Sequence, residues 1–194
     1  GGSQTVSYCR LVGQSLYGRN VTARLSLEAY LEIVAATNFK QRTRKMLEYY
    51  HADRLNFAVA GTPNRLEYDQ GFFVKNGDGS ADVKPIAHLY KTQVYRLAEY
   101  LSVPAEIRQR PPTTDTYSLP QGQDEFYFAL PYQQMDLCLF GKNHRLSADT
   151  VAKAAGLDVP MVKRVWADID RKRETTRYLH LKPALVESVS EISA

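Results

Sequence analysis

The sequence is poor in cysteine and tryptophan and has no long apolar run. It contains two cysteines, Cys9 and Cys138, and one tryptophan in 194 residues. The cysteines lie far apart, without the spacing of a metal site, so we interpret them as reduced, buried thiols in a cytoplasmic protein. No segment approaches the roughly 18 apolar residues of a membrane span, and no signal peptide is recognisable. These absences argue against a membrane protein and against a disulfide-stabilised secreted domain.

The overall composition is that of an ordinary globular protein. Hydrophobic residues make up 44% and charged residues 24%, and no low-complexity segment or internal repeat is present. A chain of this length fits a single domain with its own core. The formal net charge of +4 permits a polyanionic ligand such as a nucleotide and does not require nucleic acid.

Residues 55–91 join a short apolar run to a loop rich in charge and glycine. Leu55–Ala60 predicts a strand buried on both faces, of the kind found in an open parallel α/β sheet. Ligands bind beyond the carboxyl ends of such strands, which places Thr62 where its hydroxyl would meet a phosphate or a base. Glu67, about one turn later, either holds a divalent metal or is a solvated surface carboxylate.

The remainder of this loop carries charges of alternating sign and two aromatic residues. Asn76–Gly79 is a strong turn signal, and the twelve-residue ligand spacing of a calcium loop is absent. Phe72 and Phe73 either line a bound aromatic ring or pack in the core. Asp78 is expected to shape the turn rather than to contact a ligand.

The segment before this loop predicts two helices. Residues 26–36 place apolar side chains at helical spacing, and Asn38 is a candidate N-cap for a second helix over 39–50. That helix would begin with cations at 40, 42, 44 and 45, which its dipole disfavours. Either an anion binds nearby or this is a solvated basic face.

Further helices are predicted after the loop. Tyr90–Leu101 has helical periodicity, Ser147–Ala155 has Ser147 as cap and Gly156 as stop, and Pro160 opens a third helix with one apolar stripe. Thr113–Gln123 is either a surface loop or a lid over a nucleotide. Tyr178–Pro183 is expected to be extended.

An ordered set of motifs in residues 38–136 resembles the ammonia- or glutamine-dependent NAD synthetases. The matching blocks are the N-x-K-x-R-x-R start at Asn38–Arg44, the GTxNxxE motif at Gly61–Glu67, the F-T-K-x-G-D-G-like Phe73–Gly79 with Asp82 and Pro85, the L-Y-K-T-Q-V of Leu89–Val94, Pro111–Thr113, Asp124-Glu125, Tyr132 and Asp136.

The resemblance implies an α/β fold with a partial open parallel sheet of the adenine nucleotide alpha-hydrolase-like (N-type ATP pyrophosphatase) type and a helical carboxyl-terminal part. It also implies that ATP adenylates the nicotinate carboxylate of deamido-NAD and that ammonia, free or supplied from glutamine, displaces AMP. No nucleic acid or membrane takes part, and we expect a homodimer. The implied residue roles are ATP binding by Thr62, Lys91 and Thr113, deamido-NAD binding by Arg44, Lys75 and Asp82, and Mg²⁺ coordination by Glu67.

Two departures from the family pattern qualify these expectations. The pyrophosphate loop of the form S-G-G-x-D-S is not found in these 194 residues. We therefore interpret the chain as the carboxyl-terminal portion of a synthetase, with a site core at 37–140 and a helical tail at 141–194. At the tail, the family's usual substrate-binding pair falls on Glu174-Thr175, which leaves the acceptor's identity open.

Three functions remain from the sequence. The first is the NAD synthetase reaction, and the second is amidation of another carboxylate by the same chemistry or an inactive fragment. The third is a DNA-binding module, because residues 146–171 have a helix-turn-helix rhythm and the pI is about 9.0. The predicted second helix has no obvious base-reading side chains at its start, which disfavours this third function.

Overall fold

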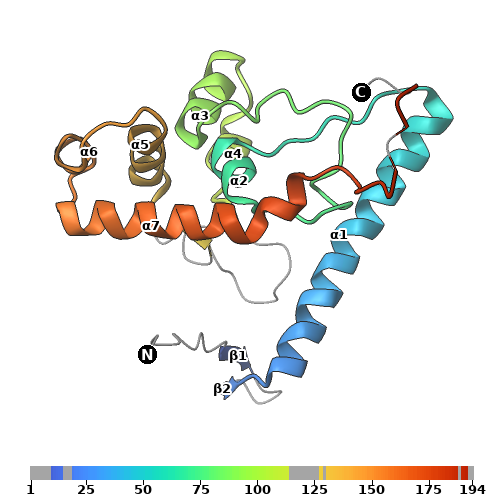
Figure 1. Cartoon of the computed structure of the whole chain (residues 1–194), viewed down its shortest axis with the longest axis horizontal. Helices are drawn as coiled ribbons and strands as arrows, with labels where there is room; N and C mark the ends of the chain where they lie inside the picture. The colour runs from blue at the N-terminus through green and yellow to red at the C-terminus, as the bar shows by residue number, and fades with distance from the viewer. Residues whose placement is uncertain (1–9, 15–18, 114–126, 129, 188, 192–194) are drawn as a thin grey trace.

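The chain forms a largely helical structure. The computed structural model describes residues 10–14, 19–113, 127–128, 130–187 and 189–191. The elements in chain order are β1 (Arg10–Gln14), β2 (Asn20–Arg24), α1 (Leu27–Leu55), α2 (Arg65–Gln70), α3 (Lys91–Tyr100), α4 (Ala105–Arg108), α5 (Tyr132–Asn143), α6 (Ala148–Ala155), α7 (Val159–Thr176) and the 3-10 helix η2 (Arg177–His180). Helices α5, α6 and α7 lie together at one side, and the long α1 runs diagonally along the other (Figure 1).

Helix α1 is one continuous helix, so the predicted break at Asn38 is wrong. Its N-cap is Ser26, whose Oγ accepts a hydrogen bond from the Ala29 N–H at 3.1 Å. It ends at Asn56 in the left-handed conformation, with φ of 55°. No glycine or proline occurs between these caps, so nothing forces the helix to stop. The basic residues at 40–45 therefore lie in mid-helix, and the helix dipole gives no reason to expect an anion beside them.

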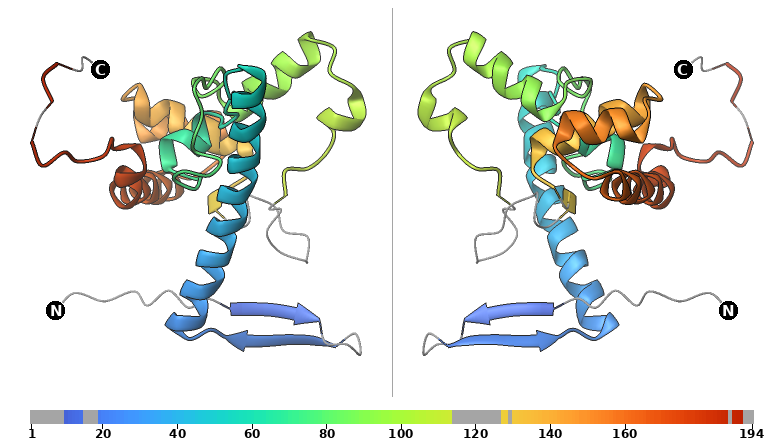
Figure 2. Two further views of the ribbon diagram at one scale, coloured as in Figure 1. Left: turned by 90° about the vertical axis from the view of Figure 1, so that its right-hand side faces the viewer. Right: turned by 90° about the vertical axis from the view of Figure 1, so that its left-hand side faces the viewer.

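Sheet structure in the described residues is sparse. Strands β1 and β2 pair as an antiparallel hairpin that the sequence did not predict, and both side views place it at the far end of α1, away from the other helices (Figure 2). An isolated parallel bridge joins Ala60 to Val83. The strand predicted over Leu55–Ala60 is wrong at its start, because Leu55 ends α1 and Phe57 is 69% exposed. Only Val59 in this run is buried.

The core lies between α2, α5, α6 and α7, together with Phe128. The apolar stripe predicted for α7 is confirmed, since Val162, Val165 and Ile169 are buried against the neighbouring helices. The buried members of the core are Leu66, Phe128, Met135, Cys138, Leu139, Val151, Ala152, Val162, Val165 and Ile169. Because α6 and α7 bury their apolar faces here, the helix-turn-helix rhythm is accounted for by packing.

Local signals set the ends of α6 and α7. The Ser147 Oγ accepts from the Thr150 N–H at 3.1 Å, and Gly156 ends α6 with φ of 65°, as predicted. Asp158 caps α7 by accepting from the Met161 N–H at 2.6 Å, with a proline in the first turn. The Trp166 indole donates to the Cys138 carbonyl at 2.8 Å, which ties α7 to α5.

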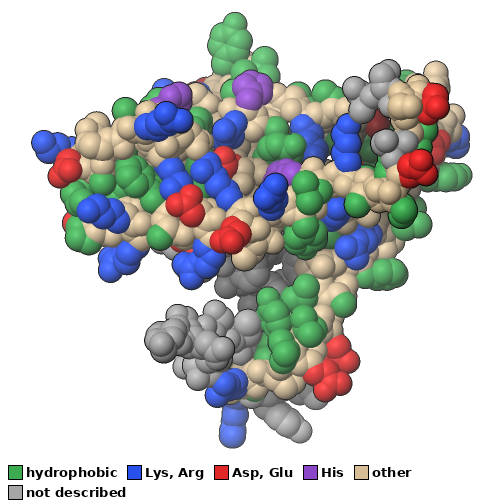
Figure 3. Space-filling view, viewed as in Figure 1, with side chains coloured by type: hydrophobic (Ala, Val, Ile, Leu, Met, Phe, Trp, Pro, Cys, Tyr) green, Lys and Arg blue, Asp and Glu red, His purple; other side chains and the backbone are tan. Residues whose placement is uncertain are grey.

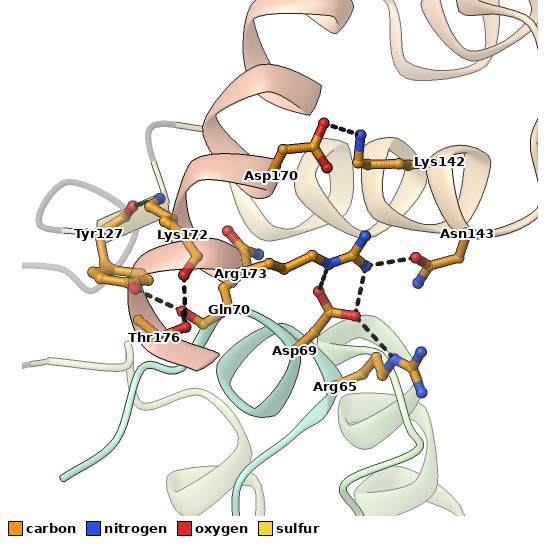
Figure 4. Close-up of polar contacts among 10 residues, drawn as sticks. All are labelled: Arg65, Asp69, Gln70, Tyr127, Lys142, Asn143, Asp170, Lys172, Arg173 and Thr176. Atoms are coloured by element: carbon orange, nitrogen blue, oxygen red, sulfur yellow. Dashed lines mark hydrogen bonds and ion pairs between the residues drawn. The ribbon is translucent and has the colours of Figure 1, made fainter. Parts of the chain in front are cut away.

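Polar contacts fix α7 across α2 and α5 (Figure 4). The Arg173 guanidinium makes a bidentate pair with Asp69, with Nε–Oδ1 and Nη2–Oδ2 distances of 2.7 and 2.8 Å, and donates to Asn143 at 2.6 Å. The hydroxyls of Tyr127 and Thr176 both donate to the Gln70 carbonyl at the end of α2. Helix α7 thus continues to Thr176, and η2 replaces the first part of the segment predicted to be extended.

Two glycines share a backbone conformation, but we expect alanine to lower the free energy of unfolding by different amounts at each. Gly71 and Gly156 both end helices with positive φ, but a methyl group added at Gly71 would overlap Thr176, whereas one at Gly156 would meet open space. Gly156→Ala is expected to cost about 1 kcal/mol from backbone strain alone. Gly71→Ala is expected to cost about 3 kcal/mol, because overpacking adds to that strain. Urea unfolding monitored by circular dichroism measures both, and equal losses would contradict this assignment.

Some sequence expectations concern residues that the structure does not describe. Cys9, most of the predicted lid at 113–123 and the Asp124-Glu125 pair lie outside the described residues. Cys138 is buried as predicted, and burial raises the pKa of its thiol to about 11. None of the helices in the described part of the chain has the length and apolar content that a membrane crossing requires.

Candidate functional site

The amino-terminal ends of α2 and α3 meet at one place. The Arg65 N–H, at the start of α2, donates to the Leu89 carbonyl just before α3 at 2.8 Å. The Gly61 N–H donates to the Val83 carbonyl at 2.8 Å, which fixes the exposed Thr62 next to the start of α2. Glu67 lies in the first turn of α2, and the positive charge of Lys91 is close enough to lower the pKa of its carboxyl. The contacts around the two helix starts thus gather Thr62, Glu67 and Lys91.

Glu67 has both a structural contact and an unusual electrostatic environment. Its Oε2 accepts from the Asn64 N–H at 2.9 Å, and the Asn64 side chain accepts from the N–H groups of Leu66 and Glu67, which completes a capping box. Burial raises the pKa of Glu67, the hydrogen bond from Asn64 and the charge of Lys91 lower it, and Asp78 raises it. Asn64 and Glu67 stand three residues apart, which is a sequence signature of a capping box that our interpretation of the sequence did not use.

The described residues contain no group of three or more acidic, histidine or cysteine side chains that would hold a metal by itself. Glu67 offers one carboxylate, and Asp78 lies near enough to affect it. Mg²⁺ is commonly bound through one or two carboxylates together with substrate phosphates and water. The donor set at Glu67 therefore fits a magnesium ion that arrives with a nucleotide.

Lys91 opens α3, as predicted, and is held from α5. The N–H groups of Lys91 and Thr92 donate to the two carboxylate oxygens of Asp136, at 3.2 and 2.7 Å. The Lys91 ammonium lies 5.4 Å from the ring centre of Tyr132 and 5.7 Å from that of Tyr95. Burial raises the pKa of Asp136, while the hydrogen bonds from Thr92 and Lys91 and the charge of Lys91 lower it.

A second group of predicted site residues faces the middle of α1. The turn at 74–79 packs against the helix, and a methyl group at Gly77 would lie 3.2 Å from the Cβ of Gln41. The Arg42 Nε donates to the Lys75 carbonyl at 3.2 Å. Asp82 accepts from the Val59 N–H at 2.7 Å and from the Tyr49 hydroxyl at 3.5 Å. Burial and then the charge of Asp82 raise the pKa of Tyr49.

Arg44 and Lys75 point toward different neighbours in this second group. Arg44 donates to Gln41 one turn earlier in α1, and its charge lowers the pKa of Asp78, which burial raises. Asp78 itself accepts from the Val74 N–H at 2.8 Å, so its predicted role in the turn is confirmed. The Lys75 ammonium donates to the carbonyls of Tyr178 and Leu181, at 3.0 and 3.3 Å.

Phe72 and Phe73 belong to separate clusters. Phe72 stacks on Tyr127 with ring centres 4.5 Å apart and packs against the core, as one of the two predicted alternatives has it. Phe73 instead lies beside Tyr68 and His180. The Lys84 ammonium lies 4.9 Å from the Tyr68 ring centre, and burial lowers its pKa. This cation among aromatic rings was not predictable from local patterns, because Lys84 and His180 lie far along the sequence from Tyr68 and Phe73.

The remaining predicted positions are exposed. Thr113 is exposed just after Pro112, and its place near the other residues rests on the family resemblance. Glu174 and Thr175 are also exposed, and the Thr175 hydroxyl donates to carbonyls within α7. The face shown in Figure 3 carries Lys and Arg side chains interspersed with acidic ones over α7, and hydrophobic side chains gather lower down over the first part of α1.

The comparison with family models decides the family. The model of the NAD synthase family matches residues 17–178, which is most of the chain. The chain belongs to the NAD synthase family.

Curated relatives in this family agree with that membership. The chain is 71% identical over 182 residues to an NH3-dependent NAD⁺ synthetase of Rhizobium meliloti, a match that covers 94% of this chain and 54% of the relative. It is 64% identical over 189 residues to one of Mesorhizobium japonicum, covering 97% of this chain and 59% of the relative. The chain thus spans about half the length of the curated relatives it matches.

A solved structure supports the fold. The NMN synthetase from Francisella tularensis aligns with a TM-score of 0.61 and 28% sequence identity, over 82% of this chain and 62% of that chain. The predicted similarity of the fold to that of such synthetases is therefore confirmed, whereas the predicted open parallel sheet stays a prediction. The sheet pairings in which both partners are described include the β1–β2 hairpin and the Ala60–Val83 bridge.

Proposed function

We propose that this chain is part of an ATP-dependent amide-forming ligase that makes NAD. The nicotinate carboxylate of deamido-NAD attacks the α-phosphorus of ATP, which forms an acyl-adenylate and releases pyrophosphate. Ammonia then attacks the acyl carbon, AMP leaves with the bonding electron pair, and the surplus proton goes to solvent. The observation that carries the proposal is the meeting of Thr62, Glu67 and Lys91 at the starts of α2 and α3.

The ATP would be held at these two helix starts. The Lys91 ammonium supplies positive charge to the phosphates, and its attachment to α5 supports a fixed position for that charge. Thr62 offers a hydroxyl to the nucleotide, and Thr113 is assigned to it by the family resemblance. Glu67 would hold the magnesium ion, which when bound neutralises phosphate charge.

Deamido-NAD would bind along the turn that packs on α1. Arg44 and Lys75 are the cations assigned to it, and Asp82 is the acceptor for its hydroxyl groups. An ammonium has three donor hydrogens, and Lys75 gives two of them to tail carbonyls, which leaves one for the dinucleotide. Asp82 likewise keeps acceptor capacity beyond its contacts with Val59 and Tyr49.

The wider assembly is part of the same proposal. We propose that the extended run before Gly61 joins an open parallel sheet in the complete enzyme, supported by the parallel bridge from Ala60 to Val83. We also propose a cytoplasmic homodimer. Large apolar side chains exposed on α1, including Phe39 and Met46 at 71% each, support an interface there. Sedimentation velocity of the complete enzyme tests the dimer, and a monomer at micromolar concentration would contradict it.

A chimera tests the reaction. This chain replaces the matching part of the R. meliloti relative, and the parent protein serves as control because the two segments are 71% identical. We expect the chimera to form NAD, with continuous release of pyrophosphate over many turnovers, only when ATP, deamido-NAD and ammonia are all present. Glutamine in place of ammonia tests the nitrogen source.

A second candidate remains for the carboxylic acid that accepts the ammonia. Similarity to an NMN synthetase favours testing the mononucleotide acid that would give NMN by the same amidation. If a folded chimera leaves deamido-NAD unchanged but consumes that acid, the acceptor assignment is wrong and the adenylating chemistry stands. If neither acid supports pyrophosphate release while the parent is active, the proposed function is wrong.

A further inference from the structure

Helix α3 begins without a cap from its own sequence. The residues at its start are Tyr90, Lys91 and Thr92, and the Tyr90 side chain caps no N–H of the helix. The Gln93 side chain accepts at 2.9 Å from the Tyr90 N–H, which lies before the first turn. The first N–H groups of a helix need acceptors from elsewhere. Here they are taken by Asp136, a residue of α5 that is distant in sequence.

The contact between Asp136 and the start of α3 has an electrostatic role in addition to capping the helix. Lys91 places a cation at the positive end of the α3 dipole, which is unfavourable by itself. Asp136 brings a carboxylate to the same end, and it is 5% exposed, so water screens it little. Its two oxygens accept from two successive N–H groups, which fixes both the position and the rotation of the first turn.

Helix α5, which carries Asp136, also borders the Lys91 side chain. Tyr132 lies one turn before Asp136 on α5, and its ring centre is 5.4 Å from the Lys91 ammonium. Lys91 is therefore held by α5 at both ends, through its backbone N–H by Asp136 and at its ammonium by Tyr132. The α5 surface that does this is anchored in the core by Met135 and Leu139, both buried.

We propose that Asp136 is a positioning residue that sets the place of the Lys91 ammonium for the adenylation step. The proposal rests on the proposed function, in which Lys91 contacts the ATP phosphates. Asp136 itself touches no substrate. It orients the first turn of α3, and the hydrogen bond from the Arg65 N–H to the Leu89 carbonyl joins this helix start to that of α2, where the nucleotide and its metal would bind.

The test uses Asp136→Asn in the chimera. Asparagine keeps the size of the side chain but has one carbonyl oxygen for the two N–H groups and removes the charge. We expect kcat/KM for ATP to fall about ten- to a hundredfold, the cost of a small misplacement, with KM for ammonia unchanged. Asp136→Glu retains a carboxylate and is expected to keep more activity than Asp136→Asn.

A double-mutant cycle separates positioning from general destabilisation. If Asp136 acts through Lys91, then Asp136→Asn should add little to the loss caused by Lys91→Ala, whereas independent effects would multiply. Ser147→Ala, which removes the cap of α6, is the matched control for a lost helix cap and should leave the KM for ATP unchanged. If Asp136→Asn fails to fold, the same cycle is run with Asp136→Glu.

The outcomes distinguish this inference from the proposed function. Loss of activity in Lys91→Ala with normal activity in a folded Asp136→Asn overturns the positioning role alone. Multiplicative losses in the double variant overturn it as well. If Lys91→Ala retains full activity, the phosphate role of Lys91 is wrong, and the proposed ATP site fails with it.

Discussion

Replacing Lys91 with alanine is expected to lower kcat/KM for ATP by about 10²- to 10³-fold in the complete enzyme, as measured by pyrophosphate release. A cation fixed beside the phosphates stabilises the charge of the transition state, and removing one preorganised group of this kind costs that much. The stability of the folded chain should change little, because the variant loses the attraction of Lys91 to the Asp136 carboxylate and the Tyr132 ring while a repulsion from the helix dipole is relieved. Lys91 stands at the positive end of α3, so its removal relieves an unfavourable interaction of about 0.3–1 kcal/mol.

Arg96→Ala is the matched control for this prediction. Arg96 lies on the same helix, is exposed, and its replacement changes the net charge by the same amount. It should leave kcat/KM for ATP within about twofold, in line with the small energies of exposed charges. An equal loss of activity in both variants would indicate a general effect of charge on nucleotide attraction and would contradict a specific phosphate contact at Lys91. Raising the salt concentration distinguishes these cases, because long-range attraction is screened.

Arg173→Ala is expected to lower the free energy of unfolding by about 3 kcal/mol. The Asp69 side chain is 8% exposed, so without Arg173 its charge is left buried, and Arg65, 3.7 Å away, is its remaining cationic partner among the described residues. Breaking a buried pair by removing one partner typically costs 3–5 kcal/mol. The substitution also removes one of the links between α7 and α2 and takes away the Arg173 donor to Asn143. Urea unfolding of the chain, monitored by circular dichroism at 222 nm, measures the change.

Arg171→Ala provides the control on the same helix. Arg171 is 69% exposed and pairs with Asp168 within one turn, so its removal should cost less than about 0.5 kcal/mol. Arg173→Lys keeps the charge but loses the bidentate geometry and should fall between the two alanine variants. If Arg173→Ala and Arg171→Ala cost the same, the buried network of Figure 4 does not hold α7 in place.

The sequence predicted best the helices whose ends and faces are set locally. Ser147 and Gly156 fix the ends of α6, and the stripe of α7 fixes which face is buried. It failed for α1, because Asn38 has the chemistry of a cap but no neighbouring residue interrupts the helix. It also missed α5, in which apolar residues surround the helix without the stripe that marks an amphipathic one.

For the candidate site, the sequence likewise predicted some residues and missed the contacts of others. Motif order named Thr62, Glu67 and Lys91, and the structure brings these together through contacts between the starts of α2 and α3. The contacts of the supporting residues were not evident from local patterns, although Asp136 belongs to the matching motifs. Asp136 bonds to Lys91 across 45 positions of sequence, and Arg173 pairs with Asp69 across 104. One local clue was available, since the start of α3 lacks a side-chain cap of its own and so requires an acceptor from another segment.

The fluorescence of Trp166 can report on one particular junction of the fold, because its indole donates to the Cys138 carbonyl between α7 and α5. Trp166 is the single tryptophan of the sequence, so the emission excited at 295 nm comes from the junction of α5 and α7. The hairpin and α1 contribute no signal at that wavelength. A red shift of the emission that precedes the loss of helical circular dichroism would therefore identify the α5–α7 junction as the first part of the protein to open to water.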